Sequence, residues 1–134
     1  MNDTSFDHDD ITTEGTQDLP HAVTRADAAA EAWEDAVRLQ RWAPADHADF
    51  YALGCEMVRT LQALDDLARL LGPRVRFYGR GRDVYDDTRA IDPTARLADA
   101  AAELELLAEL LTAAQRPANR FWSAIGHIGV EVTR

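Results

Sequence analysis

The chain has 134 residues, which is the size of one ordinary domain and too short for two independent cores or a large multi-layer enzyme. Its 46% of hydrophobic residues and mean hydropathy of −0.34 fit a globular core and exclude a wholly disordered or fibrous chain. The chain has 24 acidic residues and 14 basic ones, and all the basic ones are arginine. The resulting net charge of −10 disfavours broad adhesion to nucleic acid or to an anionic membrane.

Cysteine usage and targeting signals bear on where the protein works. Cys55 is alone in the sequence, so it cannot form an internal disulfide and lacks the companions of a thiolate metal site. The first ten residues carry four aspartates and no base, the reverse of a secretory signal. No window approaches eighteen uninterrupted apolar residues. We therefore expect a cytoplasmic protein, and the alanine- and arginine-rich composition without lysine is typical of a GC-rich bacterial genome or a phage.

The N-terminal segment differs in composition from the rest. Residues 1–23 contain six acids and no base, so the remaining chain has a net charge of −4 (18 acids against 14 arginines). Such a segment buries too little apolar surface to offset the entropy of ordering it. We expect a disordered acidic tail over residues 1–23, with an arm for a basic partner as the functional alternative. A single domain is expected over residues 24–134.

Two helices are predicted in the first half of this domain. The first covers about residues 24–42 with Thr24 as N-cap, and its apolar stripe is Ala26, Ala30, Trp33 and Val37. The second covers about residues 45–71, where Gly72 and Pro73 supply a C-terminal stop. Its stripe, with helical spacings of three and four, is Phe50, Gly54, Met57, Leu61, Leu64, Ala68 and Leu71.

Two further helices are predicted in the second half. The third begins with Asp92 as N-cap and Pro93 at its first position, where proline's missing donor costs nothing. Its broad apolar face is Leu97, Ala101, Leu104, Leu106, Leu107, Ala108, Leu110 and Leu111. A short fourth helix starts at Pro117 and ends near Gly126 or Gly129.

These elements predict an all-α fold, a helical bundle of three long helices plus a short C-terminal helix. No segment shows the alternation of a half-buried strand over a useful length, and no repeat of twenty to fifty residues is present. A broad leucine face serves a bundle closed within one chain or one completed by oligomerisation, and the sequence leaves both open.

The predicted loop over residues 73–92 stands out because it is locally basic. The run PRVRFYGRGR carries +4 without an acid, and its candidate partner- or phosphate-binding residues are Arg74, Arg76, Phe77, Tyr78, Arg80 and Arg82. Guanidinium groups bind phosphate and carboxylate, and aromatic rings offer a face to an unstacked base. Three interpretations stay open: pairing with the protein's own carboxylates, contact with an acidic protein surface, and contact with nucleic acid.

Other polar residues offer little chemistry. The aspartates of DVYDD (Asp83, Asp86 and Asp87) lack the spacing of a calcium loop, and Asp65 and Asp66 are assigned to a solvated helix face. His47 and His127 each suit a helix end. We therefore predict no catalytic residue, no metal site and no cofactor. Trp42 and Trp122 lie near predicted helix ends, where an exposed ring could anchor a protein partner.

The leading hypothesis is a non-enzymatic helical adaptor or accessory subunit that docks onto proteins through an apolar helical face and the arginine-rich loop. One alternative is a small helical subunit of a complex that contains nucleic acid, contacting RNA or single-stranded DNA through residues 74–82. In size and expected shape the chain is similar to the small helical subunits of multisubunit CRISPR effectors, an analogy of architecture that no motif carries. The second alternative is a small ligand- or metal-binding enzyme.

Overall fold

A computed structural model describes residues 21–132 of the chain, and these residues form three α-helices and no β-strand. The helices are α1 (Ala22–Trp42), α2 (His47–Arg76) and α3 (Pro93–Ile125). The described part therefore confirms the all-α prediction. It divides into one unit up to Pro44, which holds α1, and one from Ala45 onward, which holds α2 and α3. The prediction of one domain over residues 24–134 stays a prediction.

The first helix begins earlier than predicted. His21, not Thr24, is its N-cap, because the imidazole Nδ1 accepts a hydrogen bond from the backbone N–H of Val23 at 3.2 Å. Of the acidic tail predicted over residues 1–23, only the last three positions lie among the described residues, and they open the helix. The end of α1 at Trp42 agrees with the prediction.

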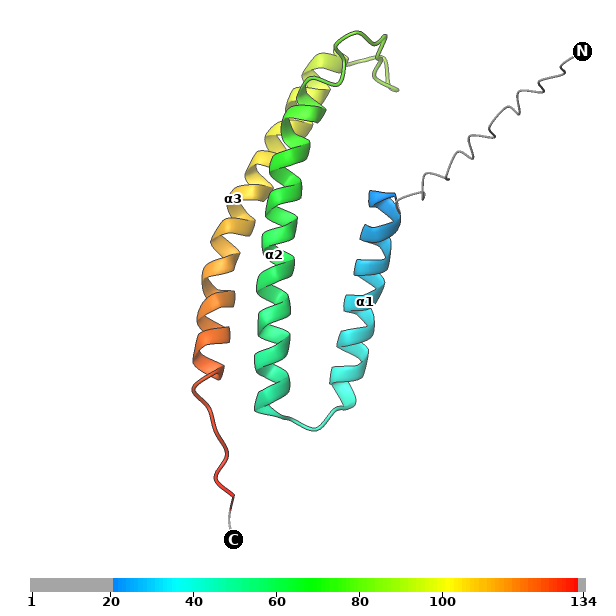
Figure 1. The fold of residues 1–134 in the computed structure, drawn as a ribbon. Helices are drawn as coiled ribbons and strands as arrows, with labels where there is room; N and C mark the ends of the chain where they lie inside the picture. The colour runs from blue at the N-terminus through cyan, green and yellow to red at the C-terminus, as the bar shows by residue number, and fades with distance from the viewer. Residues whose placement is uncertain (1–20, 133–134) are drawn as a thin grey trace, which may run out of the picture. The chain divides into compact units, whose positions relative to one another are not determined.

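Helices α2 and α3 pack side by side as an antiparallel hairpin (Figure 1). Asp46 caps α2 by accepting the N–H of Ala48 at 2.8 Å, and Asp92 caps α3 by accepting the N–H of Thr94 at 3.1 Å. The capping role of Asp92 and the placement of Pro93 in the first turn follow the sequence prediction. The cap of α2 at Asp46 places its start two residues later than predicted.

Two proline positions correct the predicted helix ends. Helix α2 does not stop at Gly72 and Pro73 but continues to Arg76, and α3 continues through Pro117, so the predicted fourth helix does not exist as a separate element. An internal proline costs a helix about 3 kcal/mol. Contacts between the helices flank both prolines: Arg76 donates to Glu105 at 2.8 Å beyond the first proline, and Ala118 is buried directly after the second.

The seam between α2 and α3 is lined by small side chains. Its buried apolar residues are Ala68, Ala101, Ala108 and Ala118, together with Gly54 and Gly72. A methyl group added at Gly54 would lie 3.0 Å from ring carbon Cε1 of Phe121, which shows how closely α3 approaches this glycine. Among the described residues, no side chain larger than alanine is completely buried. The hairpin therefore has a narrow seam and no thick core.

Candidate functional site

The most extensive feature of the hairpin is an apolar surface along one side of the seam. On α2, a leucine directly precedes each of four buried residues: Leu53 precedes Gly54, Leu64 precedes Asp65, Leu67 precedes Ala68, and Leu71 precedes Gly72. One residue turns a helix by about 100°. These leucines are therefore aligned on one side of α2, beside the seam and not within it.

Helix α3 shows this arrangement at one of its three buried residues. Leu107 directly precedes buried Ala108. In an antiparallel pair of right-handed helices, the residue before a seam residue turns to the same side of the pair on both helices. We call this surface the leucine face, and its members are Leu53, Met57, Leu64, Leu67 and Leu71 on α2 and Leu107, Leu110, Ala114, Phe121 and Ile125 on α3.

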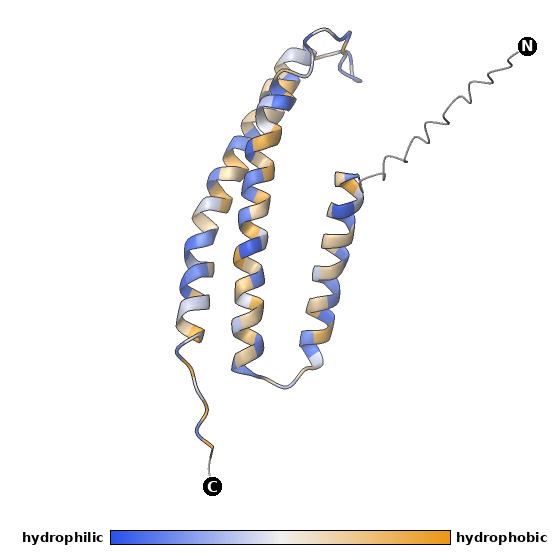
Figure 2. Ribbon diagram, viewed as in Figure 1, coloured by the Kyte–Doolittle hydropathy of each residue, from blue (hydrophilic) through white to orange (hydrophobic). Residues whose placement is uncertain are grey.

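The leucine face is open within its own unit. Leu64 and Leu107 are 46% and 45% exposed, and Leu110 is 58% exposed. Figure 2 shows apolar residues recurring along both helices among hydrophilic ones. A run of large apolar side chains that follows two packed helices exceeds the scattered apolar exposure that is ordinary on a monomer. It identifies a surface suited to contact with another apolar surface.

The opposite side of the seam is polar and organised around Asp65. Arg69 Nε donates to Asp65 Oδ1 at 2.7 Å, and the Thr112 hydroxyl donates to Asp65 Oδ2 at 2.7 Å, with Gln115 adding a bond at 3.2 Å. The Thr112 bond contributes most to lowering the pKa of Asp65 below its ordinary value of 3.8, and with Arg69 and Gln115 it outweighs the opposing effect of burial. The assignment of Asp65 to a solvated helix face was wrong. This network ties α3 to α2 in one register.

The arginine-rich segment is divided between a helix and the loop. Arg74 and Arg76 lie in the last turn of α2, and the connection between the helices is residues 77–92, shorter than the predicted loop over residues 73–92. Arg76 pairs with Glu105 at 2.8 Å, as the interpretation of internal pairing expects for that residue. Glu105 is 29 positions away in the sequence, so only the register of the hairpin identifies it as the partner.

Arg80 and Arg82 lie over aromatic rings of the same segment. The guanidinium carbon of Arg80 is 4.0 Å from the centroid of the Phe77 ring, and that of Arg82 is 4.4 Å from the centroid of the Tyr78 ring. Arg82 also donates to the carbonyl oxygen of Tyr78 at 3.0 Å. No carboxylate of the described chain forms an ion pair with either arginine. Their charges are therefore held on an aromatic support and exposed to solvent.

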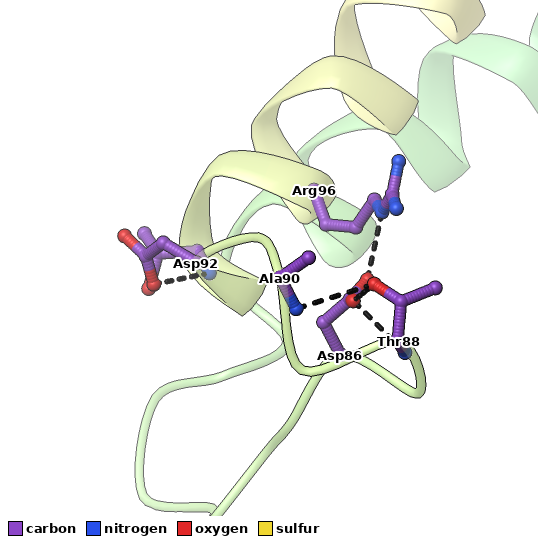
Figure 3. Close-up of polar contacts among 6 residues, drawn as sticks. Asp86, Thr88, Ala90, Asp92 and Arg96 are labelled. Carbon is purple, nitrogen blue, oxygen red and sulfur yellow. Dashed lines mark hydrogen bonds and ion pairs between the residues drawn. The ribbon is translucent and has the colours of Figure 1, made fainter.

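Asp86 fixes the second half of the loop. Its side chain, only 3% exposed, accepts from Arg96 Nε at 2.8 Å, from the N–H of Thr88 at 3.0 Å and from the Thr88 hydroxyl (Figure 3). The Thr88 hydroxyl contributes most to lowering the pKa of Asp86, followed by Arg96. This carboxylate thus holds the loop against the start of α3. Asp83 and Asp87 are exposed, and the described residues contain no group of three or more potential metal ligands.

The two histidines lie at the other end of the hairpin. His47 and His127 line an open hollow of about 610 Å³ together with Tyr51 and Trp122. The rings of Tyr51 and Trp122 are 5.6 Å apart, and the indole Nε1 is buried without a hydrogen-bond partner among the described residues. Asp83, Asp86 and Asp87 lie in the loop at the opposite end of α2 (Figure 1), so the fold does not bring these aspartates near the two histidines, as an enzymatic pocket shared by them would require.

The remaining candidates are two tryptophans and the cysteine. Trp42, the last residue of α1, is 83% exposed, whereas Trp122 is half-buried in the seam region. Cys55 is half-buried on α2.

None of the three described helices combines the length and apolar character that a membrane-spanning segment requires.

Comparisons with protein-family models, with curated proteins and with solved structures find no match to this chain.

Proposed function

We propose that this protein is a non-enzymatic helical adaptor or accessory subunit, and that it docks onto a protein partner through the leucine face. One observation carries the proposal: large apolar side chains line one side of the hairpin, and six of them stay 42–58% exposed, namely Met57, Leu64, Leu67, Leu107, Leu110 and Phe121. Complete burial of a leucine contributes about 1.5–3 kcal/mol. Covering the remaining half of several such residues offsets an association cost of about 4–15 kcal/mol.

The arginine-rich segment has a supporting role in this proposal. Arg80 and Arg82 present two cations at the loop end of the hairpin in a chain whose net charge is −10. Charged groups beside an apolar contact set orientation and association rate more than affinity. The two guanidiniums therefore orient a partner with an acidic surface next to its apolar one.

Affinity capture with two matched double variants tests the docking surface. Leu64→Glu/Leu107→Glu places charges on the leucine face. Leu70→Glu/Leu106→Glu places the same charges on leucines of similar exposure, 51% and 48%, just beyond the outer edge of the face. We expect proteins captured from host extract by the wild-type chain to be retained by the second variant. The first variant should capture at least tenfold less of these proteins, which corresponds to about 1.4 kcal/mol of binding free energy.

Circular dichroism of both variants provides the control for folding, since equal helix content excludes loss of structure as the cause. Capture that survives the charges on the leucine face, or that is lost equally with both variants, would contradict docking through this surface.

A second candidate function, contact with single-stranded nucleic acid, is favoured by one observation. Arg80 and Arg82 are exposed and pair with aromatic rings, not with carboxylates of the described chain, and guanidinium and aromatic groups together form the usual platform for unpaired bases. This function predicts a gel shift of single-stranded RNA or DNA that weakens as salt rises. Arg80→Ala/Arg82→Ala should abolish it.

Arg116→Ala/Arg120→Ala is the matched control for charge, because it removes two exposed arginines from α3. Absence of a shift at low salt, or an equal loss with both double variants, would eliminate this second candidate.

A further inference from the structure

We propose that a hollow at the loop end of the hairpin, between the end of α2 and the start of α3, binds a phosphate monoester carried on a planar apolar group. The hollow has a volume of about 460 Å³, within the usual range of about 300–1,000 Å³ for small-ligand sites. The inference goes beyond the docking proposal and does not depend on it, because no residue that lines the hollow belongs to the leucine face.

The charge of this hollow is opposite to that of the whole chain. Arg76 and Arg80 line it, and no acidic residue of the described chain does so. In the sequence these two arginines belong to residues 74–82, a run with four arginines and no acid. The chain as a whole carries −10. A hollow lined in this way attracts an anion, although most of the protein surface repels one.

Both guanidinium groups keep hydrogen-bond donors for a ligand. A guanidinium carries five N–H donors, and Arg76 uses only Nη2 to donate to Glu105, at 2.8 Å. Arg80 forms no ion pair within the described chain, and its guanidinium carbon lies 4.0 Å from the centroid of the Phe77 ring. Contact with the ring holds this guanidinium in place before a ligand arrives, so less side-chain entropy is lost on binding.

The rest of the lining is largely apolar. Phe77, Leu97 and Ala98 contribute apolar surface to the same hollow, and Thr94 contributes a hydroxyl group from the first turn of α3. Sites for small ligands usually combine such surface with a few polar groups that fix the orientation of the ligand. A ligand that joins an anion to a planar apolar group contacts the guanidiniums and the apolar lining together.

A phosphate monoester matches two guanidiniums better than other common anions do. It carries about −1.5 to −2 charges at neutral pH and three strongly accepting oxygen atoms, whereas a carboxylate carries a single charge on two oxygens. Guanidinium groups bind phosphate through pairs of parallel N–H donors. Two arginines therefore balance the charge of one monoester and share its oxygen atoms.

The loop beside the hollow is held in place by the protein itself. A Cβ atom at Gly79, which lines the hollow, would lie 3.3 Å from Cγ2 of Val84 and 3.6 Å from Cδ1 of Leu97, so this turn packs closely against its neighbours. Further along the loop, Asp86 pairs with Arg96 of α3 at 2.8 Å. The site is thus formed in advance, which reduces the cost of binding.

Isothermal titration calorimetry of the full-length protein with phenyl phosphate tests the inference. We expect saturable binding of this probe. Inorganic phosphate, which lacks the planar group, and benzoate, which lacks the second charge, should both bind more weakly.

Two matched double variants locate the binding. Arg76→Gln/Arg80→Gln should weaken the affinity for phenyl phosphate by about tenfold or more. Arg116→Gln/Arg120→Gln removes the same charge from exposed positions of α3 that do not line the hollow, and it should leave the affinity unchanged within about twofold.

Two single variants decide the matter if the first double variant loses structure. Arg80→Gln leaves the pair of Arg76 and Glu105 in place, and it should still weaken binding by about threefold or more. Glu105→Gln removes the carboxylate that competes with the ligand for Arg76, and it should strengthen binding. A purely structural role of this ion pair predicts no gain in affinity.

Three results would overturn the inference: no binding of phenyl phosphate, an equal loss of affinity in both double variants, or equal affinity for phenyl phosphate and inorganic phosphate. Titrations with a nucleoside 5′-monophosphate and with a phosphotyrosine peptide then distinguish the sources of the phosphate. We expect at least one of them to bind as tightly as phenyl phosphate, and failure of both would also overturn the inference.

The proposals fail separately. Capture that depends on Leu64 and Leu107 can persist in a chain that binds no phosphate, and phosphate binding can persist when both leucines are replaced by glutamate. A single-stranded oligonucleotide without a terminal phosphate carries only diesters, so its gel shift tests the second candidate function and not this hollow.

Discussion

Replacing Ala101 with leucine is expected to lower the free energy of unfolding by about 1–3 kcal/mol, the usual cost of forcing extra methylenes into a packed site. Ala101 has no exposed surface and lies in the seam between α2 and α3. Domains of this size are stable by about 5–15 kcal/mol, so the loss is a large share of the total. Urea unfolding at a fixed protein concentration, followed by circular dichroism, measures it.

The neighbouring residue provides the matched control. Ala102 is exposed on the same turn of α3, and leucine and alanine are both strong helix formers. Ala102→Leu should therefore change the free energy of unfolding by no more than about 0.5 kcal/mol. Equal destabilisation by the two substitutions would show that the seam is not closely packed at Ala101.

Acid is expected to destabilise the hairpin through Asp65. Bonds from Thr112, Arg69 and Gln115 hold the pKa of this carboxyl below 3.8 in the folded chain. The unfolded chain therefore binds the proton more readily, and the stabilisation is complete above pH 3.8 and is lost as the pH falls through the lower folded value. The free energy of unfolding should decrease as the pH falls below 3.8, and chemical denaturation at several pH values between about pH 5 and pH 2 measures it.

Two asparagine variants separate the contacts of Asp65 from simple loss of charge. Asp65→Asn should be less stable than the wild type at neutral pH and should lose less stability on acidification. Asp66→Asn removes a carboxylate from the same turn, at an exposed position, and keeps the Asp65 contacts. We therefore expect this variant to lose as much stability on acidification as the wild type. An unchanged acid response in Asp65→Asn would contradict a role for this network.

Local signals in the sequence predicted the helices and several of their ends. Asp92 and Pro93 have side chains that favour helix starts wherever they occur, and the structure uses both in this way. Pro73 and Pro117 led to wrong predictions of helix ends, because both helices continue past them. The contacts that flank these prolines, the pairing of Arg76 with Glu105 and the burial of Ala118, cannot be read from the local sequence.

The site was predictable in outline only. The broad apolar stripes of α2 and α3 were visible, but their division into a buried seam and an open face follows from which residues meet across the pair. A signal for this division exists: leucine directly precedes a small or buried residue at Gly54, Ala68, Gly72 and Ala108. The Asp65 network left no such signal, because its partners on α3 are 47 and 50 positions away.

The alanine and glycine seam has a calorimetric consequence. The heat capacity gained on unfolding grows with the apolar surface that becomes hydrated, and a lone hairpin whose leucine face is already about half exposed has less such surface left to hydrate than a closed bundle. The plot of its free energy of unfolding against temperature would be shallow, so this free energy would stay small and nearly constant over a wide range of temperature. The curvature of the plot would increase if the leucine face became covered, so its shape reports how much of the face is buried.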